Sequence, residues 1–336
     1  MSTRAPYPLV SILMPAYNAE KWIAGSIQSA LAQDWPRIEV VVVDDGSRDG
    51  TLSVARRFES SRVKVISQEN RGAAAARNTA LSLAQGDYIQ WLDADDLLAP
   101  TKLSRQLLDR PDLSEDVLLS SSFGIFSVRT SAARFMPTPL WQDLSPVDWL
   151  TARFSRNLWM NPAVWLVSRG LTARVGPWNE ALSLDDDGEY FSRVVAGSSR
   201  VAFVPEARSY YRFWNAGSLS RRRSDAACHS LLTSLRLSIG YLLSLEDSER
   251  TRRAGVQYLQ TFFLYFYPEK ADLLQEVRSF AAALGGELAP PTLQPHYEIV
   301  RRAFGWQCAK EARHLARSTK LWWKLTCEMV LAKVLD

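Results

Sequence analysis

Cysteine and histidine are scarce in this chain of 336 residues, which has three of each. Cys228, Cys308 and Cys327 are odd in number and lack CxxC spacing, which argues against a disulfide framework or a zinc knuckle and favours a reducing compartment. The scattered histidines make a histidine metal site improbable. A run of about 18 apolar residues, the length of a transmembrane helix, is absent. Residues 1–6 lead into a strand without a secretory h-region, so we expect a cytoplasmic protein.

The composition is that of a packed globular protein. Apolar residues make up 47% of the chain and aromatic residues 11%, which is typical of folded domains and not of disordered ones. The length suits one large domain, or one domain with an appendage. The formal net charge of +4 is modest, and its distribution matters more than its size. We expect no nucleic-acid partner.

Strand and helix patterns alternate through residues 1–100. Apolar runs predict strands at 9–14, 39–43, 63–67 and 87–92, and helical periodicity predicts helices at 19–32, 51–58 and 73–84. Such alternation with short connections predicts an α/β fold, a mostly parallel sheet with helices on both faces. Ligands bind open sheets of this kind outside the carboxyl ends of the strands.

Polar or conformationally special residues follow each predicted strand, at positions 15–18, 44–47, 69–72 and 93–96. The last of these segments, Asp93-Ala94-Asp95-Asp96, gathers three carboxylates that repel one another, so a hard divalent cation with oxygen ligands is the natural partner. Substrate phosphates commonly complete the coordination of such a cation. A helix N-cap or a solvated turn is the alternative. Four such segments at one sheet edge favour a site over four unrelated turns.

A second acidic cluster, Asp185-Asp186-Asp187 followed by Glu189, lies far away in sequence. If it converges on the first cluster, one carboxylate can serve a metal while another acts as general base, since different environments separate their pKa values. The alternative is the solvated acidic start of a helix.

The chain becomes irregular and rich in tryptophan and proline between residues 101 and 225, and helical from 226 to 336. We expect one domain at 1–225, built from a regular half (1–100) and an irregular half (101–225). Residues 226–336 are expected to form a helical extension, and a Gly/Pro break at 285–291 separates its last helix.

These motifs together resemble the family 2 inverting glycosyltransferases of the GT-A fold. The resemblance covers roughly residues 8–222, and five motifs in the right order and spacing make it specific. The matching segments are 10–18 (VSILMPAYN), 43–47 (VDDGS), 70–72 (NRG) with 76–78 (ARN), 87–89 (DYI) with 92–96 (LDADD), and 175–180 (VGPWNE) leading to 186–189 (DDGE). A Rossmann-like GT-A sheet with a C-terminal helical extension is therefore the expected fold. The resemblance implies that 1–100 is the nucleotide-binding half of this domain and 101–225 the acceptor half.

The resemblance also implies roles for individual residues. Asp95 is expected to ligate Mg²⁺ or Mn²⁺, with Asp93 contacting the metal, the ribose or the donor sugar. For Asp96 the resemblance implies no role, and its place after the strand suggests only a cap of the next helix. Asp187 matches the catalytic base, and Asp186 stays a candidate for it. The remaining expected contacts are Pro15, Ala16, Tyr17, Asp45, Gly72 and Arg77 around the donor nucleotide, and Trp178, Arg212, Ser218 and Ser220 around the acceptor or diphosphate.

The implied activity is that of an inverting, metal-dependent hexosyltransferase. It would move a sugar from a UDP-linked donor to a hydroxyl of a glycan, lipid-linked or protein acceptor in envelope or exported polysaccharide synthesis. Two other readings are a catalytically silent binding homologue and a sugar-nucleotide pyrophosphorylase. The intact acidic motifs argue against a silent homologue. The absence of a Gly-rich phosphate loop after the first strand argues against a pyrophosphorylase.

The segment from Arg301 to Lys333 carries eight Lys or Arg residues and two acidic ones. On a helix its tryptophans and its basic residues fall on different faces, a pattern typical of peripheral binding to an anionic membrane. An ordinary helix that packs its apolar stripe onto the domain is the alternative.

Overall fold

The computed structural model describes residues 7–110, 114–213 and 224–334, without the side chains of 314–315 and 317–334. Its first half is a parallel sheet. Strands β1 (Val10–Ala16), β2 (Ile38–Asp45), β3 (Val63–Gln68) and β4 (Tyr88–Trp91) are connected by helices α1 (Ile23–Leu31), α2 (Thr51–Arg56) and α3 (Ala73–Leu83). The predicted alternation is therefore confirmed, because each expected element occurs within a few residues of its predicted place.

The second half extends the same sheet in the order β3-β2-β1-β4-β8-β6-β9-β5, with β7 paired to β6. Strand β8 (Leu166–Ser168) is antiparallel to β4, whereas β6 (Val117–Phe126) and β9 (Arg200–Arg212) are parallel to each other. The remaining elements are β5 (Leu97–Leu98), β7 (Arg134–Phe135), α4 (Lys102–Leu108), α5 (Pro146–Arg156), α6 (Arg169–Val175), α7 (Asp186–Gly197), and the 3₁₀ turns η1 (Thr130–Ala132) and η2 (Pro162–Val164). This mixed α/β sheet has the expected GT-A-like form.

Both faces of the central strands are buried, as the apolar run in β2 predicts. Val40 and Val42 belong to a core shared with α1 and α4, whereas Val41 and Val43 belong to a second core under α3, α5 and α7. Side chains alternate between the two faces of a strand, so one uninterrupted apolar run supplies both layers.

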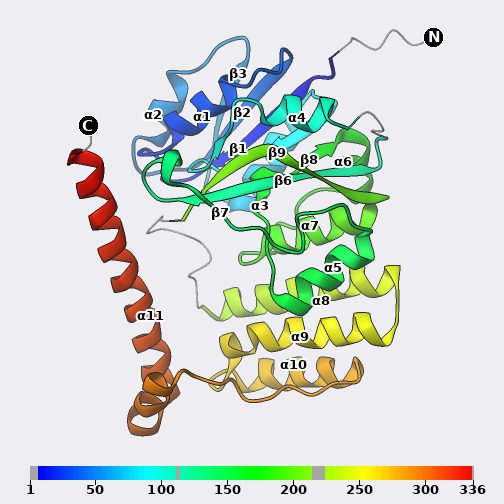
Figure 1. Cartoon of the computed structure of the whole chain (residues 1–336), viewed down its shortest axis with the longest axis vertical. Helices are drawn as coiled ribbons and strands as arrows, with labels where there is room; N and C mark the ends of the chain where they lie inside the picture. The colour runs from blue at the N-terminus through cyan, green and yellow to red at the C-terminus, as the bar shows by residue number, and fades with distance from the viewer. Residues whose placement is uncertain (1–6, 111–113, 214–223, 335–336) are drawn as a thin grey trace.

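Four helices follow the sheet: α8 (Asp225–Leu245), α9 (Glu249–Phe266), α10 (Ala271–Ala283) and α11 (Pro295–Val334). Figure 1 shows α8, α9 and α10 stacked in succession on the side of the sheet covered by α5 and α7, while α11 runs apart from this stack. Gly305, with φ 83°, breaks the helical backbone inside α11. In the portion that the structure describes, none of the helices combines the length and apolar character needed to cross a bilayer.

One predicted helix starts later than its periodicity indicates. We expected a helix from residue 19, but α1 begins at Ile23. Asn18 has φ 49°, and the backbone amides of Asn18 and Ala19 donate to Ser47 Oγ (3.0 Å) and Thr51 Oγ1 (2.7 Å). These bonds hold the chain after β1 against the loop after β2, so the polar ends of both strands face the same edge.

Candidate active site

Arg77 joins the two acidic clusters that lie far apart in sequence. Its guanidinium contacts Asp93 Oδ1 through Nη2 (3.0 Å) and Asp186 Oδ2 through Nη1 (2.7 Å). The Arg77 side chain is 8% exposed, and the helix α3 that carries it opens with small residues packed against the sheet. A buried arginine between two carboxylates is a charge-assisted bridge with fixed geometry. The predicted convergence of the two clusters is therefore present in the structure.

Trp178 lies under this bridge and is only 2% exposed. Its ring stacks on Tyr190 at a centroid distance of 4.0 Å, and the Arg77 guanidinium lies 4.4 Å from its centroid. Asn78 fixes the backbone of Trp178 by donating to its carbonyl oxygen (2.9 Å) and accepting from its amide (2.8 Å). Because the side chain is almost fully buried among these contacts, the predicted contact between Trp178 and an acceptor does not fit its surroundings.

Asp187 differs from its neighbour Asp186. Asp186 is ion-paired to Arg77, whereas Asp187 Oδ1 accepts from the amide of Gly188 at 2.9 Å. Burial, followed by the charges of Asp186 and Asp185, raises the pKa of Asp187 to about 7, with Arg77 acting in the opposite direction. A carboxyl group with a pKa near neutrality can both accept and release a proton under ordinary conditions.

The Asp93–Asp96 cluster separates into distinct environments. Asp93 and Asp95 are partly exposed, whereas Asp96 is 1% exposed. Asp96 Oδ1 accepts from the amide of Arg212 (2.8 Å), and Oδ2 has no hydrogen-bond partner in the described structure. Burial and the charges of Asp95 and Asp93 raise the pKa of Asp96 well above its usual value. The expectation that Asp96 caps the next helix is wrong, because α4 follows Thr101 and Asp96 instead binds the end of β9.

Arg212 closes the other side of this cluster. Its Nε donates to the carbonyl oxygen of Asp95 (2.9 Å), and its guanidinium lies 4.3 Å from the ring centroids of Trp22 and Phe126. At 8% exposure this side chain connects β9 to the acidic loop, so the predicted contact of Arg212 with a diphosphate is not supported by its surroundings. Ser218 and Ser220, predicted in the same role, lie outside the described residues.

The predicted nucleoside contacts gather at the carboxyl ends of β1 and β2. Pro15 and Ala16 pair with Val43 and Asp44 in the sheet, and Tyr17, which follows them, is 43% exposed. Asp45 is 2% exposed; its Oδ1 accepts from the amide of Arg71 (2.9 Å), and its Oδ2 from that of Gly72 (2.8 Å). Asp45 thus shapes the loop that starts α3, a structural role the sequence did not reveal, and its contact with a base remains a prediction.

Gly72 suits close approach of a ligand to this loop. Its φ of 94° is favourable only for glycine, and a β-carbon built there would meet no atom within 4 Å. The space beside it lies at the start of α3, whose free amide groups favour anions.

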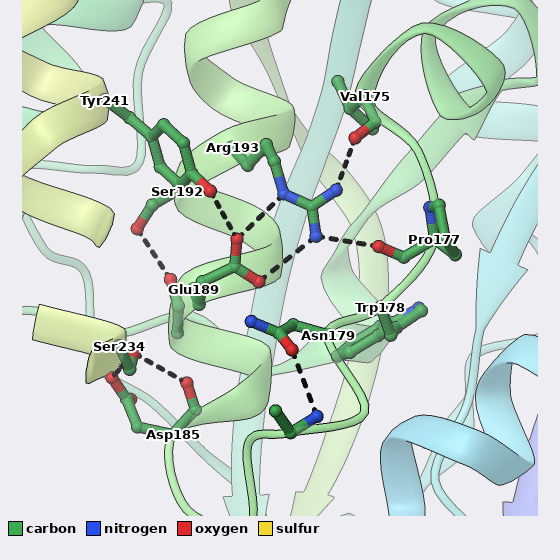
Figure 2. Close-up of polar contacts among 12 residues, drawn as sticks. Val175, Pro177, Trp178, Asn179, Asp185, Glu189, Ser192, Arg193, Ser234 and Tyr241 are labelled. Carbon is green, nitrogen blue, oxygen red and sulfur yellow. Dashed lines mark hydrogen bonds and ion pairs between the residues drawn. The ribbon is translucent and has the colours of Figure 1, made fainter. Parts of the chain in front are cut away.

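The start of α7 is held by contacts that the sequence did not reveal (Figure 2). Glu189, 1% exposed, accepts from Arg193 Nε (2.8 Å) and from the Tyr241 hydroxyl of α8 (2.7 Å). Arg193 also donates to the carbonyl oxygens of Val175 and Pro177, in the loop that leads to Trp178. Glu189 and Arg193 stand four residues apart, a spacing that could have suggested their pairing. No local signal pointed to Tyr241.

Asp185 is fixed in the same way. It has φ 60° immediately before α7, and the Ser234 hydroxyl of α8 lies 2.6 Å from its Oδ2 and 2.9 Å from its carbonyl oxygen. Ser230, one turn earlier on α8, accepts from the amides of Ser183 and Leu184 (2.8 and 3.0 Å). The loop that delivers Asp186 and Asp187 is therefore attached to a helix of the C-terminal extension.

Comparison with known proteins agrees with this architecture. The family model described as Glycosyl transferase family 2 matches residues 11–154. The UDP-Glc:alpha-D-GlcNAc-diphosphoundecaprenol beta-1,3-glucosyltransferase WfgD of Escherichia coli is 47% identical over 100 residues, which are 30% of this chain and 40% of the relative. The match thus spans about two fifths of that relative's length.

Two solved structures resemble the fold over most of the chain. Residues 1–349 of S. aureus TarS, in complex with UDP-GlcNAc, superpose with a TM-score of 0.57 at 18% identity, covering 82% of this chain and 89% of TarS 1–349. The mannosyltransferase PcManGT from Pyrobaculum calidifontis, in complex with GDP-Man and Mn²⁺, gives a TM-score of 0.51 at 20% identity, covering 84% and 85%. At these identities the likeness concerns the fold alone. Residues 11–154 therefore belong by sequence to glycosyl transferase family 2, and the fold is of the GT-A type seen in the two transferase structures.

Proposed function

We propose that the protein transfers a sugar from a UDP-linked donor to an acceptor hydroxyl with inversion of configuration, in the synthesis of a cell-envelope polysaccharide. The observation that carries this proposal is the Arg77 bridge between Asp93 and Asp186. It brings the cluster suited to a nucleotide diphosphate and the cluster suited to a general base to one edge of the sheet. Transfer between a donor and an acceptor needs both chemistries at one place.

The donor assignment is supported by the polar edge and by the relatives. Tyr17 is exposed beside the loop of Asp45 and Gly72, where a nucleoside can lie against a ring and a diphosphate against free amides. WfgD is named for a UDP-glucose donor, and the TarS structure contains UDP-GlcNAc. UDP is therefore the nucleotide to test first.

Asp95 and Asp93 would hold a Mg²⁺ or Mn²⁺ ion. Their carboxylates are the hard oxygen ligands that these ions prefer, and both side chains are accessible. Among the described residues no group of three or more His, Cys, Asp or Glu side chains is placed to hold a metal, so donor phosphates would complete the coordination. When bound, such an ion neutralises the charge that develops on the departing diphosphate.

Asp187 is the proposed general base. Asp186 is neutralised by Arg77, whereas Asp187 has no such ion pair and has a pKa near 7. It would take the proton from the acceptor hydroxyl while the oxygen attacks the anomeric carbon from the face opposite the leaving diphosphate. A single displacement of this kind inverts the anomeric centre.

The acceptor is a glycan or a lipid-linked saccharide, with protein as a third class to test. The name of WfgD describes a diphosphoundecaprenol-linked acceptor, and the basic segment 301–336 suits work at the cytoplasmic face of an anionic membrane. Both features favour a lipid-linked acceptor at that surface.

The test uses the full chain with a panel of UDP-, GDP- and TDP-linked sugars, with and without Mn²⁺. At least one UDP-sugar should bind more tightly with the metal and undergo slow hydrolysis. If none does so, the donor assignment fails. Asp187→Asn should keep donor binding and lose transfer, and retained transfer in this variant together with loss in Asp186→Asn would assign the base to Asp186.

A further inference from the structure

Trp159 is unusual among the tryptophans of this protein. Of those whose side chains the structure describes, it alone is exposed, at 44%. It stands in the short connection between α5 and η2, just after Asn157 ends α5 with φ 50°. An exposed tryptophan presents a large apolar surface to water, which folding alone does not favour.

This exposed ring is fixed by other rings. The ring centroid of Phe123 in β6 lies 5.0 Å from that of Trp159. The ring centroid of Tyr211 in β9 lies 5.1 Å from it, at an interplanar angle of 67°. Phe123 in turn contacts Trp141, whose ring stacks on Phe203. Contacts with neighbouring rings restrict the orientation of an aromatic side chain. Trp159 is therefore a rigid surface whose exposed part does not serve the packing beneath it.

Tyr211 connects this surface to the acidic site. It precedes Arg212, which binds the backbone of Asp95 and the carboxylate of Asp96. Strand pairing places Tyr210, the residue before Tyr211, opposite Leu97, which directly follows the Asp93–Asp96 cluster. A tyrosine hydroxyl at this place can donate a hydrogen bond.

The tryptophan under the Arg77 bridge cannot offer such a surface. Trp178, which the family resemblance placed against the acceptor, is 2% exposed and lies against Tyr190 and the Arg77 guanidinium. Trp159 is accessible, and its ring contacts that of Tyr211, the residue before Arg212.

We propose that Trp159 and Tyr211 form the subsite for the acceptor sugar. The apolar C–H face of a pyranose ring would lie on the exposed indole of Trp159, and Tyr211 would hydrogen-bond to the same sugar, so that one of its hydroxyls points to Asp187. This inference rests on the proposed glycosyl transfer and adds its acceptor class, a pyranoside. Burial of an apolar sugar face against a rigid aromatic ring needs no further ordering of the protein.

The experiment measures binding of methyl β-D-glucopyranoside, methyl β-D-galactopyranoside, methyl α-D-mannopyranoside and methyl N-acetyl-β-D-glucosaminide to the full chain with UDP and Mn²⁺. Saturation-transfer NMR reports which sugar protons touch the protein. We expect at least one pyranoside to bind through its axial C–H protons. Trp159→Ala should weaken its binding roughly tenfold or more, as truncation of a central aromatic contact does, and Trp159→Phe should weaken it less.

Phe304→Ala, at a 72% exposed position of α11, is the matched control and should bind like the unchanged protein. Hydrolysis of the donor and the melting temperature are measured in parallel, and both should be kept in Trp159→Phe. Donor hydrolysis without binding of any pyranoside, or equal binding in Trp159→Ala, would overturn the subsite and leave the glycosyl transfer standing. Loss of metal-dependent donor binding in the unchanged protein would overturn the proposed function, and the subsite with it.

Discussion

Arg77 illustrates at the scale of one residue how the site is assembled. Its two ion pairs join positions 16 and 109 residues away in sequence, and its guanidinium also lies on Trp178. Lysine offers a single compact charge, whereas arginine offers a planar fork that can bind two carboxylates and stack on a ring at once. The position therefore requires arginine for its shape as much as for its charge.

Replacement of Arg77 by lysine should lower the rate of sugar transfer by on the order of 100-fold, because one carboxylate loses its partner and both clusters shift. The measurement is kcat at saturating donor. Arg71→Lys is the control, since Arg71 forms an exposed pair with Glu180 (2.9 Å) whose loss should cost little. Equal effects of the two substitutions would contradict a bridging role for Arg77.

The pH dependence of transfer should report the ionisation of Asp187. Its pKa is raised to about 7, and a general base works as the carboxylate, so kcat/KM should fall as the pH decreases below about 7 and level off above it. In Asp186→Asn a negative neighbour disappears and Arg77 loses a competing partner. Both changes favour the carboxylate, so the midpoint should move to lower pH by on the order of one unit. A midpoint that stays or rises would contradict this assignment.

Lys102 predicts a pH effect on stability instead of activity. It is fully buried, and its Nζ donates to Gln90 Oε1 and Gln106 Oε1, each at 2.6 Å. Burial lowers the pKa of Lys102 well below its usual value. Below the ordinary lysine pKa of about 10.4 the unfolded chain then binds a proton that the folded chain lacks, so this residue's contribution to stability increases as the pH rises toward that value.

Urea unfolding of the protein and of Lys102→Met at pH 7 to 10 isolates this contribution. The free energy of unfolding of the unchanged protein, minus that of the variant, should increase with pH by up to about 1.4 kcal/mol per unit. A difference that is constant with pH would mean that Lys102 keeps its proton on folding.

At the scale of elements, local sequence patterns predicted the sheet, and the contacts that complete the site depend on distant residues. The apolar run in β2 predicted a strand buried on both faces. The polar residues after four strands predicted a site at the sheet edge where those strands end. Burial of Trp178, which lies in a loop, depends on Arg77 and Asn78 of α3 and on Tyr190 of α7. The late start of α1 depends on bonds to the loop after β2. Such long-range contacts leave no periodic signal.

Helix α8 positions α7, which predicts a specific effect on catalysis. Ser234→Ala removes the hydroxyl that holds Asp185, and Tyr241→Phe removes the one that holds Glu189. Because these contacts act on the segment of Asp187 and not on the nucleoside side, kcat should fall roughly tenfold while KM for the donor stays unchanged.

Thr233→Ala is the matched control for these variants, because the Thr233 hydroxyl donates within its own helix, to the carbonyl oxygen of His229 (3.0 Å). It should leave both constants unchanged. A rise in donor KM with constant kcat in Ser234→Ala would show that α8 acts on the donor side instead.

At the scale of the whole molecule, the C-terminal helices differ in how they join the sheet. Val194 of α7, Leu235 of α8 and Phe263 of α9 belong to one buried cluster with the strands. The core therefore continues across the predicted boundary at residue 225. Helix α11 runs apart from this stack (Figure 1), and its described contacts include Trp306 on the ring of Tyr267 and the ion pair of Lys310 with Glu269 (2.5 Å).

This difference makes α11 the segment to test for membrane contact. The protein should sediment with vesicles containing phosphatidylglycerol and not with phosphatidylcholine alone, and added salt should weaken this binding, because each basic residue near an anionic surface contributes about 1 kcal/mol. Deletion of residues 301–336 should abolish sedimentation.

A milder variant separates charge from loss of the helix. Arg317→Glu, Lys320→Glu and Lys324→Glu, introduced together, keep the length of α11 and reverse three charges of the basic segment. The triple variant should lose vesicle binding and keep hydrolysis of the soluble donor, since the donor side of the site lies at the sheet edge and not on α11. Sedimentation that persists in both the deletion and the triple variant would remove α11 as the membrane contact and favour packing of its apolar stripe within the protein.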